Sequence, residues 1–223
     1  MDHAFARTPK QARSQLSFDR MLAAATEIID AGGLQALTLA EVSRRSKVSI
    51  GSIYCRVDSK ASLLRAVQAR TLAQMDREFA LLLTRIRRRK LPLRELVPAV
   101  VRELALYLRR HAKLLSAFMQ EGPNDPIIES AGRKSWQQNA LDFKLILLER
   151  GDEFRHPDPE HAAEMCFVVV YGCLARYLGL GSSGQNEGNW NDLIHDLGLM
   201  ALAFVSLDLK HAMHGSGKTR VSV

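Results

Sequence analysis

The sequence has 223 residues, of which 47% are hydrophobic and 25% charged, and this composition indicates a globular protein with a sizeable core. Its three cysteines exclude a disulfide framework, and no run of about 20 uncharged apolar residues could span a membrane. Residues 1–17 lack the apolar core of a signal peptide, so we expect a cytoplasmic protein without a membrane segment.

The formal net charge of +7 is concentrated in the first part of the chain. Residues 1–92 hold 17 Lys and Arg against 8 Asp and Glu, whereas residues 93–223 hold 14 against 16. A basic N-terminal part joined to a nearly neutral remainder is the electrostatic pattern of a nucleic-acid-binding domain on a different body. A basic membrane-surface domain is the alternative, but it would need a basic amphipathic helix with Trp anchors, which the sequence lacks.

The N-terminal residues predict an arm followed by a bracing helix. Residues 1–16 carry basic side chains with little apolar periodicity, and we interpret them as a flexible basic arm. Ser17 is expected to cap a helix whose apolar stripe begins at Phe18. Gly32 and Gly33 should end this helix.

Residues 38–64 predict two short helices joined by a tight turn. Thr38 can cap the first helix, and Glu41 can reach back to the Thr38 N–H to complete a capping box. Ser49 is expected to open the second short helix. This arrangement indicates a helix-turn-helix that reads DNA, and an ordinary helical hairpin in a core is the alternative.

The second short helix carries small side chains, which would let it lie close to DNA. An α-helix fits the major groove only where its exposed face is slim, and hydroxyl or basic groups beside that face can hold phosphates. Cys55 lies in the same stretch, either as a redox-sensitive thiol or as a passive small residue. The predicted DNA contacts are Thr38, Arg45, Ser49, Gly51, Ser52, Tyr54, Arg56 and Lys60.

This stretch resembles the DNA-binding domain of the tetracycline-repressor-like (TetR) transcriptional regulators. The matching features are the opening threonine, the turn, the recognition helix, a Ser-Lys pair and a leucine pair: Thr38, Ser46-Lys47-Val48-Ser49, Ile53-Tyr54-Cys55-Arg56-Val57, Ser59-Lys60 and Leu63-Leu64. Three positions depart from the family pattern, since Lys47 replaces a glycine, Arg56 a histidine and Val57 a phenylalanine. A side chain at a left-handed turn position costs about 1 kcal/mol.

The remaining sequence predicts further helices. A long helix is expected from Ser59 to a basic cluster at residues 85–90, and Pro92 ends this helix. The basic cluster is either a nucleic-acid-binding patch or a solvated helix end. Apolar residues at helical spacing predict helices at 96–119 (in two segments that meet near His111), 127–148, 161–180 and about 190–209. We therefore predict an all-α protein with an N-terminal three-helix helix-turn-helix domain and a C-terminal helical domain.

The helix expected at 161–180 is apolar on nearly every face, so every face needs to be covered. In a body of this size, one side of it is left for a second subunit. With the last helix it could form a four-helix bundle across a two-fold axis, and the homodimer would meet a palindromic operator with half-sites about 34 Å apart. A monomer whose own helices cover 161–180 is the alternative.

The resemblance also implies a role for the C-terminal domain. In TetR regulators a small effector binds an apolar pocket in this domain and weakens DNA binding, which couples the two sites. We predict a largely apolar effector, with pocket candidates that are individually more typical of plain core: Phe118, Met119, Trp136, Phe143, Phe167 and Tyr171. The expected domains are 17–65 for DNA binding, 66–212 for effector binding and dimerisation, and 213–223 for a flexible tail.

Nothing in the sequence indicates catalysis, a metal site or a cofactor. Residues 215–219 resemble the end of a P-loop, but Ala212 stands where its first glycine is needed, and His211 and His214 lack a third ligand. We therefore expect a non-enzymatic regulator, which in the resembled family is most often a repressor. The rival hypotheses are a protein that binds DNA without sequence preference and a helical ligand sensor whose head no longer binds DNA.

Overall fold

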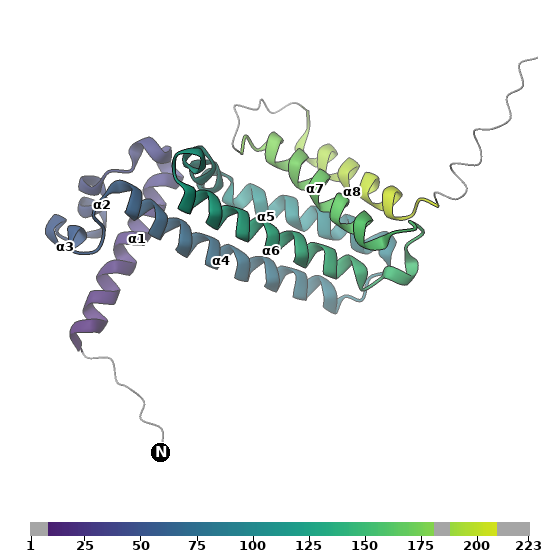
Figure 1. The fold of residues 1–223 in the computed structure, drawn as a ribbon, viewed down its shortest axis with the longest axis horizontal. Helices are drawn as coiled ribbons and strands as arrows, with labels where there is room; N and C mark the ends of the chain where they lie inside the picture. Colours follow the sequence, from purple (N-terminus) through teal and green to yellow (C-terminus); the bar gives the residue numbers. More distant parts are fainter. Residues whose placement is uncertain (1–8, 181–187, 209–223) are drawn as a thin grey trace, which may run out of the picture. The chain divides into compact units, whose positions relative to one another are not determined.

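The computed structural model describes residues 9–180 and 188–208, and its regular elements are all helical (Figure 1). The α-helices are α1 (Pro9–Ala36), α2 (Leu39–Ser46), α3 (Ile50–Tyr54), α4 (Lys60–Arg88), α5 (Leu93–Glu121), α6 (Pro126–Leu148), α7 (Pro159–Tyr177) and α8 (Trp190–Val205). Two short 3-10 helices, η1 (Gly122–Asn124) and η2 (Gly151–Glu153), flank α6. The predicted all-α class is confirmed, since no strand occurs within the described ranges.

The chain packs as two compact units, each made of two segments. The first unit comprises Met1–Gln74 and Lys113–Gly132, and the second comprises Met75–Ala112 and Arg133–Val223. The predicted domains followed chain order and divided at residue 65. The first unit instead also takes in the end of α5 and the start of α6, because apolar residues of these segments share its core.

The core of the first unit explains why short helices are held in place. Its buried members come from α1, from the loop after α1, and from α2, α3 and α4, and they are joined by four residues near the α5–α6 connection. Among them are Met21, Ile28, Ile29, Leu37, Val42, Ile53, Leu63, Val67, Ala117, Phe118 and Ile128. Helices of five and eight residues are unstable alone in water, so α3 and α2 depend on this shared core.

Helix α1 begins at Pro9, eight residues before the expected start at Ser17. Proline suits the first helical position, and nothing between Pro9 and Ser17 breaks a helix. The Ser17 hydroxyl is not a cap but donates back to the carbonyls of Arg13 and Ser14, each at 3.0 Å. The part of the predicted flexible arm at 9–16 is thus helical, and the part at 1–8 lies outside the described residues.

Helix α5 is continuous, which corrects the expectation of two helices meeting near His111. Pro98 lies inside the helix, in its second turn, and contacts α8 instead of breaking α5. A Cβ at Gly198 would come within 3.3 Å of the Pro98 Cα, so the glycine permits this close contact between the two helices. The predicted stop of α1 is present, because Gly33 has a φ of 69° that ends the regular helix.

The second unit places α7 against α8 (Figure 1). Asp158 caps α7 by accepting a hydrogen bond from the His161 N–H, and Asn189 caps α8 in the same way from Asn191 and Asp192. The thiol of Cys166 lies 3.7 Å from the Ala201 carbonyl, so the two helices are in direct contact. Burial raises the pKa of this thiol to about 12, which keeps it protonated and unreactive.

Candidate nucleic-acid interface

Helix α2 begins with half of the predicted capping box. Thr38 Oγ1 accepts a hydrogen bond of 3.1 Å from the Glu41 N–H, as expected of a threonine cap. The Glu41 carboxylate does not reach back to Thr38 but accepts hydrogen bonds from Arg44 and Arg45, at 2.7 to 2.9 Å. Two cations outcompete one backbone N–H for the carboxylate, and the Arg44 and Arg45 hydrogen bonds lower the pKa of Glu41 to about 2.

The turn between α2 and α3 contains the left-handed residue that the sequence predicted. Lys47 has a φ of 55° and forms the C-cap of α2 in place of the glycine of the family pattern. Two serines hold the turn: Ser46, which belongs to the turn quoted from the sequence, and Ser43, which the sequence did not single out. Ser43 donates to the Val48 carbonyl at 2.7 Å, and Ser46 accepts from the Val48 N–H at 3.3 Å. Val48 itself is buried in the core of the first unit.

Helix α3 has five residues, of which Ile53 alone is buried. Ser49 caps it by accepting from the Ser52 N–H at 3.3 Å, and the two hydroxyls lie 2.8 Å apart. Nothing within the described structure lies within 4 Å of a Cβ placed on Gly51, so this glycine opens directly to solvent. Tyr54 is 57% exposed on the same short helix. The exposed face of α3 is therefore slim at its centre and hydroxylated around it.

Arg56 follows α3 and is tied to helix α1. Its guanidinium donates to the carbonyl and hydroxyl of Ser14 and stacks 5.2 Å from the centre of the Phe18 ring. Lys60 has a similar intramolecular role, because its ammonium group donates to the Leu34 carbonyl at 2.9 Å. Both residues were predicted to hold phosphates, and in the structure each has an intramolecular hydrogen-bond acceptor.

Val57, which stands where the family pattern has a phenylalanine, is buried. Val57 is 4% exposed and belongs to the core of the first unit, where the smaller side chain is fully packed. Ser59 and Ser62 then open α4 by exchanging backbone-to-hydroxyl hydrogen bonds, both of 3.1 Å. These contacts fix the C-terminal side of the recognition helix.

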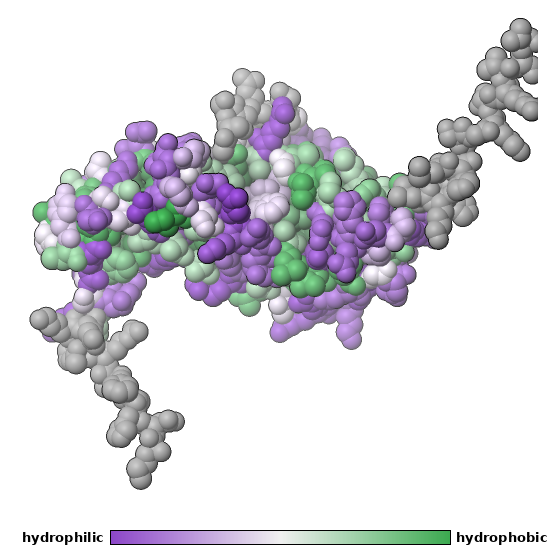
Figure 2. All heavy atoms as spheres, viewed as in Figure 1, coloured by the Kyte–Doolittle hydropathy of each residue, from purple (hydrophilic) through white to green (hydrophobic). Residues whose placement is uncertain are grey.

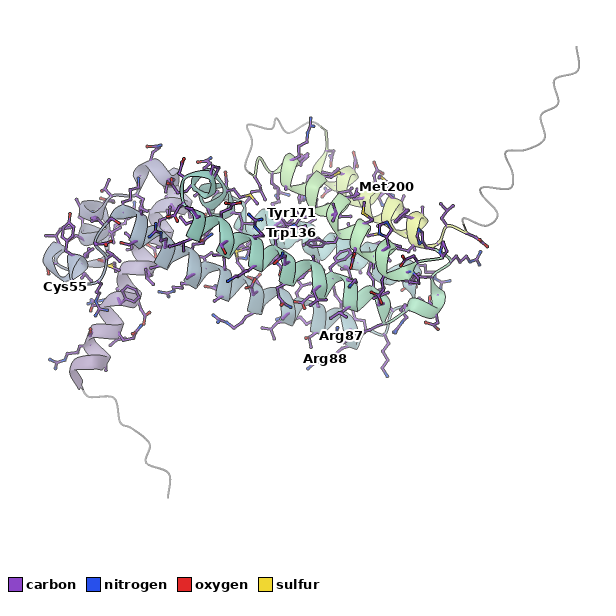
Figure 3. All side chains as sticks on the ribbon, viewed as in Figure 1. Cys55, Arg87, Arg88, Trp136, Tyr171 and Met200 are labelled. Carbon is purple, nitrogen blue, oxygen red and sulfur yellow. The ribbon has the colours of Figure 1, made fainter. Side chains whose placement is uncertain are left out.

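All eight predicted DNA contacts lie in the first unit, within residues 38–60. Ser49, Gly51, Ser52 and Tyr54 share the exposed surface of α3. The sequence analysis missed Ile50, which is 43% exposed beside them and could offer an apolar contact to a thymine methyl group. Its position directly after the N-cap Ser49 was the available signal. Cys55, labelled in Figure 3, is exposed next to this surface.

The helix-turn-helix segment is similar to known proteins in sequence. Residues 21–67 match the sequence model of the bacterial regulatory proteins of the tetR family. No curated protein matches the sequence. The helix-turn-helix segment is thus similar in sequence to the N-terminal domain of these bacterial transcriptional regulators.

Solved structures agree with this similarity at the level of the fold. A protein of Mesorhizobium loti assigned as a TetR-family transcriptional regulator has a TM-score of 0.71 at 17% identity, covering 86% of this chain and 96% of that one. A transcriptional regulator of Cytophaga hutchinsonii has a TM-score of 0.65 at 17% identity, over 85% and 98%. One of the TerR/AcrR family from Aquifex aeolicus has 0.55 at 18%, over 82% and 96%.

The predicted effector residues divide between the two units. Phe118 packs in the core of the first unit, where Met119 is 36% exposed. The other four form one aromatic cluster in the second unit: Trp136, Phe143, Phe167 and Tyr171, with neighbouring ring centres 5.4 to 6.2 Å apart. Figure 3 shows Trp136 and Tyr171 next to each other. Burial raises the pKa of Tyr171 to about 12.

Helices α7 and α8 carry exposed apolar side chains. Val168 and Val169 on α7 are 46% and 41% exposed, and Leu199 and Met200 on α8 are 50% and 57% exposed. Figure 2 shows apolar surface between polar side chains in this region, and Figure 3 labels Met200. Large apolar side chains grouped on adjacent helices are typical of a protein interface.

The basic cluster at residues 85–90 lies at the end of α4 in the second unit. Arg87 is ion-paired with Glu149 of α6, and Arg88 next to it is exposed (Figure 3).

No group of three or more potential metal ligands occurs among the residues that the structure describes. Within the same ranges, no helix is long and apolar enough to cross a membrane. The pair His211 and His214 and the P-loop-like residues lie outside those ranges.

The left-handed turn residue gives a stability prediction. Glycine adopts a φ of 55° without the cost that a Cβ imposes, so Lys47→Gly should raise the free energy of unfolding by about 0.5–1 kcal/mol. Urea unfolding followed by circular dichroism measures the change. Lys47→Ala is the control, because it removes the lysine but keeps the Cβ. A gain of the same size in Lys47→Ala would show that the backbone conformation is not the cause.

The Glu41 cluster gives a pH prediction. The arginine contacts lower the pKa of Glu41 from its ordinary value of 4.5 to about 2 in the folded protein, so these contacts stabilise the fold above about pH 4.5. This contribution is lost as the pH falls towards 2. Urea unfolding at several pH values should show Glu41→Gln less stable than the parent at pH 6, with a difference that shrinks below pH 4.5. A difference independent of pH down to 3 would contradict the assignment.

Proposed function

We propose that this protein is a regulator of the TetR type, a cytoplasmic homodimeric repressor that binds a palindromic operator through α3. A small, largely apolar effector bound in the second unit would release it from DNA. The observation that carries the proposal is the construction of α3. One buried side chain, Ile53, anchors the helix, and its opposite face carries hydroxyl groups around an open glycine. Such a helix can approach base edges in the major groove closely.

The basic side chains around α3 are placed to bind phosphates and so to position α3 on DNA. Arg45 has 37% of its side chain exposed although it contacts Glu41, and Lys60 is exposed although it contacts a carbonyl. Exposed contacts of this kind contribute little net free energy, so phosphates can compete for the same donors. Thr38, Arg45, Arg56 and Lys60 are therefore proposed as phosphate contacts, and Ser49, Gly51, Ser52 and Tyr54 as the residues that approach the bases.

Selection of bound sequences from a random duplex pool tests this proposal. The parent protein should enrich one palindromic motif, and Tyr54→Ala should lower affinity for that motif by about 10-fold or more, since a single good base contact is worth about 1–3 kcal/mol. Leu81→Ala is the control, because Leu81 is 60% exposed on α4 in the second unit and should leave binding unchanged.

Two other outcomes would contradict the proposal. Equal, salt-sensitive binding of all duplexes would indicate a protein that binds DNA without sequence preference. No binding at any salt concentration would indicate a ligand sensor whose head has lost its DNA function.

The apolar surface of α7 and α8 supports a dimer. Four large apolar side chains, 41–57% exposed, would each gain free energy from burial at about 25 cal/mol per Å². The same two helices are adjacent within one chain, so two copies related by a two-fold axis would complete a four-helix arrangement. A palindromic operator has the symmetry that such a dimer requires.

A charge placed on this surface should prevent dimerisation. Met200→Glu would bury a carboxylate in the proposed interface, so light scattering coupled to size exclusion should show the 24.9 kDa monomer where the parent elutes at twice that mass. Leu81→Glu, at a similarly exposed site on α4, is the matched control and should remain dimeric. A parent that is monomeric, or a Met200→Glu variant that stays dimeric, would contradict the interface.

The effector part of the proposal is supported by the aromatic cluster and by contacts within the first unit. Arg65 of α4 donates to Asp125 at the start of α6 at 2.7 Å, and Gln68 donates to the Ile128 carbonyl at 2.9 Å. Asp125 also caps α6 by accepting from the Ile127 N–H at 3.0 Å. A ligand that shifts α6 would strain these contacts and change the position of α4. Since α4 shares one core with α2 and α3, these two helices would move with it.

A further inference from the structure

One residue of the helix-turn-helix has a backbone conformation that costs stability. Lys47, in the turn between α2 and α3, has a φ of 55° and a ψ of 32°, in the left-handed region. Glycine adopts this conformation freely, whereas a residue with a Cβ is strained in it. Among the described residues, only Lys47 and Lys90 combine a side chain with a positive φ. Such strain, where the surrounding structure maintains it, points to a function of the residue.

The turn around Lys47 is held by its neighbours. Ser43 donates to the Val48 carbonyl and Ser46 accepts from the Val48 N–H, so both sides of this peptide are fixed. Ser46 and Val48 are buried, and Lys47 between them is exposed. The left-handed conformation is therefore imposed by the turn, while the Lys47 side chain is open to solvent.

Lys47 differs from the other basic residues of this segment in having no partner. Residues 38–60 contain basic side chains at positions 44, 45, 47, 56 and 60. Four of them have acceptors in the protein: Arg44 and Arg45 on Glu41, Arg56 on Ser14, and Lys60 on Leu34. Within the described ranges, Lys47 has neither an ion pair nor a side-chain hydrogen bond. Its ammonium group can therefore bind an anion without first giving up an internal contact.

The place of Lys47 in the chain brings it to the border of the proposed DNA interface. It ends α2 and stands two residues before Ser49, the N-cap of α3. In a helix-turn-helix the first helix crosses the DNA backbone and the second enters the major groove, so the turn between them lies at the edge of the groove. A lysine there has a long flexible stem and three donors, which suit a phosphate oxygen.

We propose that Lys47 binds a phosphate of the DNA backbone, and that the strained turn is retained for this contact. This inference rests on the proposed function, because it adds a contact to the DNA interface of the helix-turn-helix. Lys47 is not among the eight DNA contacts expected from the sequence. A phosphate contact strengthens binding to every duplex and carries no sequence preference.

The salt dependence of DNA binding tests the contact. Each neutralised phosphate changes the slope of log affinity against log salt by about 0.9, so Lys47→Gly should reduce the slope by about 0.9 for each protein copy bound, or about 1.8 for a homodimer. Operator affinity at about 0.1 M salt should fall about 10-fold or more. Lys47→Arg keeps the charge and should keep the slope. Fluorescence anisotropy at several salt concentrations measures both quantities, and an unchanged slope in Lys47→Gly would overturn the proposal.

Lys90 provides a matched control. It has a φ of 49°, is exposed, and lies after α4 in the second unit. Lys90→Gly removes the same charge and the same strained conformation as Lys47→Gly, but outside the helix-turn-helix. It should leave the slope and the operator affinity unchanged. An equal change in both variants would show that net charge is the cause, and would overturn the contact at Lys47.

A measurement of stability separates the contact from a structural role. Lys47→Gly should raise the midpoint of urea unfolding while it lowers DNA affinity, and loss of folding cannot produce this combination. Lys47→Ala keeps the Cβ and removes the ammonium group, so it should bind DNA as weakly as Lys47→Gly without the gain in stability. A Lys47→Ala variant that binds DNA as tightly as the parent would contradict the contact.

Failure of this inference is distinguishable from failure of the proposed function. A parent protein that enriches a palindromic motif, together with an unchanged slope in Lys47→Gly, would support the function and overturn the contact. Equal binding of all duplexes would contradict the repressor function, and a reduced slope on any duplex would still support the contact. A parent protein that binds no DNA would overturn both.

Discussion

The helix-turn-helix of this protein depends on the burial of Ile53. Helix α3 has only five residues, too few to persist alone in water, and Ile53 is its one buried side chain. The apolar residues of α1, α2 and α4 that surround it therefore determine where the exposed face of α3 points. The Ser49 cap and the serine contacts of the preceding turn set the direction in which the helix starts.

Local features of this domain were predictable from the sequence. The Thr38 and Ser49 caps, the stop of α1 at the glycine pair and the left-handed turn at Lys47 are all present, because each depends on a few neighbouring residues. The family resemblance carried by residues 38–64 is confirmed. Periodicity also predicted helices α6, α7 and α8 to within a few residues of their ends.

Features that depend on long-range contacts were not predictable. The contacts of Arg56 with Ser14 and of Lys60 with Leu34 join residues 42 and 26 positions apart, and spacing alone carries no sign of them. The same holds for the placement of Phe118 in the first unit, away from the aromatic residues with which it was grouped.

The central claim is that the exposed face of α3 enters the DNA groove, and Gly51 allows a direct measurement. A side chain at this position meets nothing within the protein, so Gly51→Leu should fold with an unchanged or slightly higher melting temperature. In a groove, the added side chain would hold the helix away from the bases. We predict that operator affinity, measured by fluorescence anisotropy, falls at least 100-fold while the fold is retained. Unchanged operator affinity in a folded Gly51→Leu variant would contradict the account.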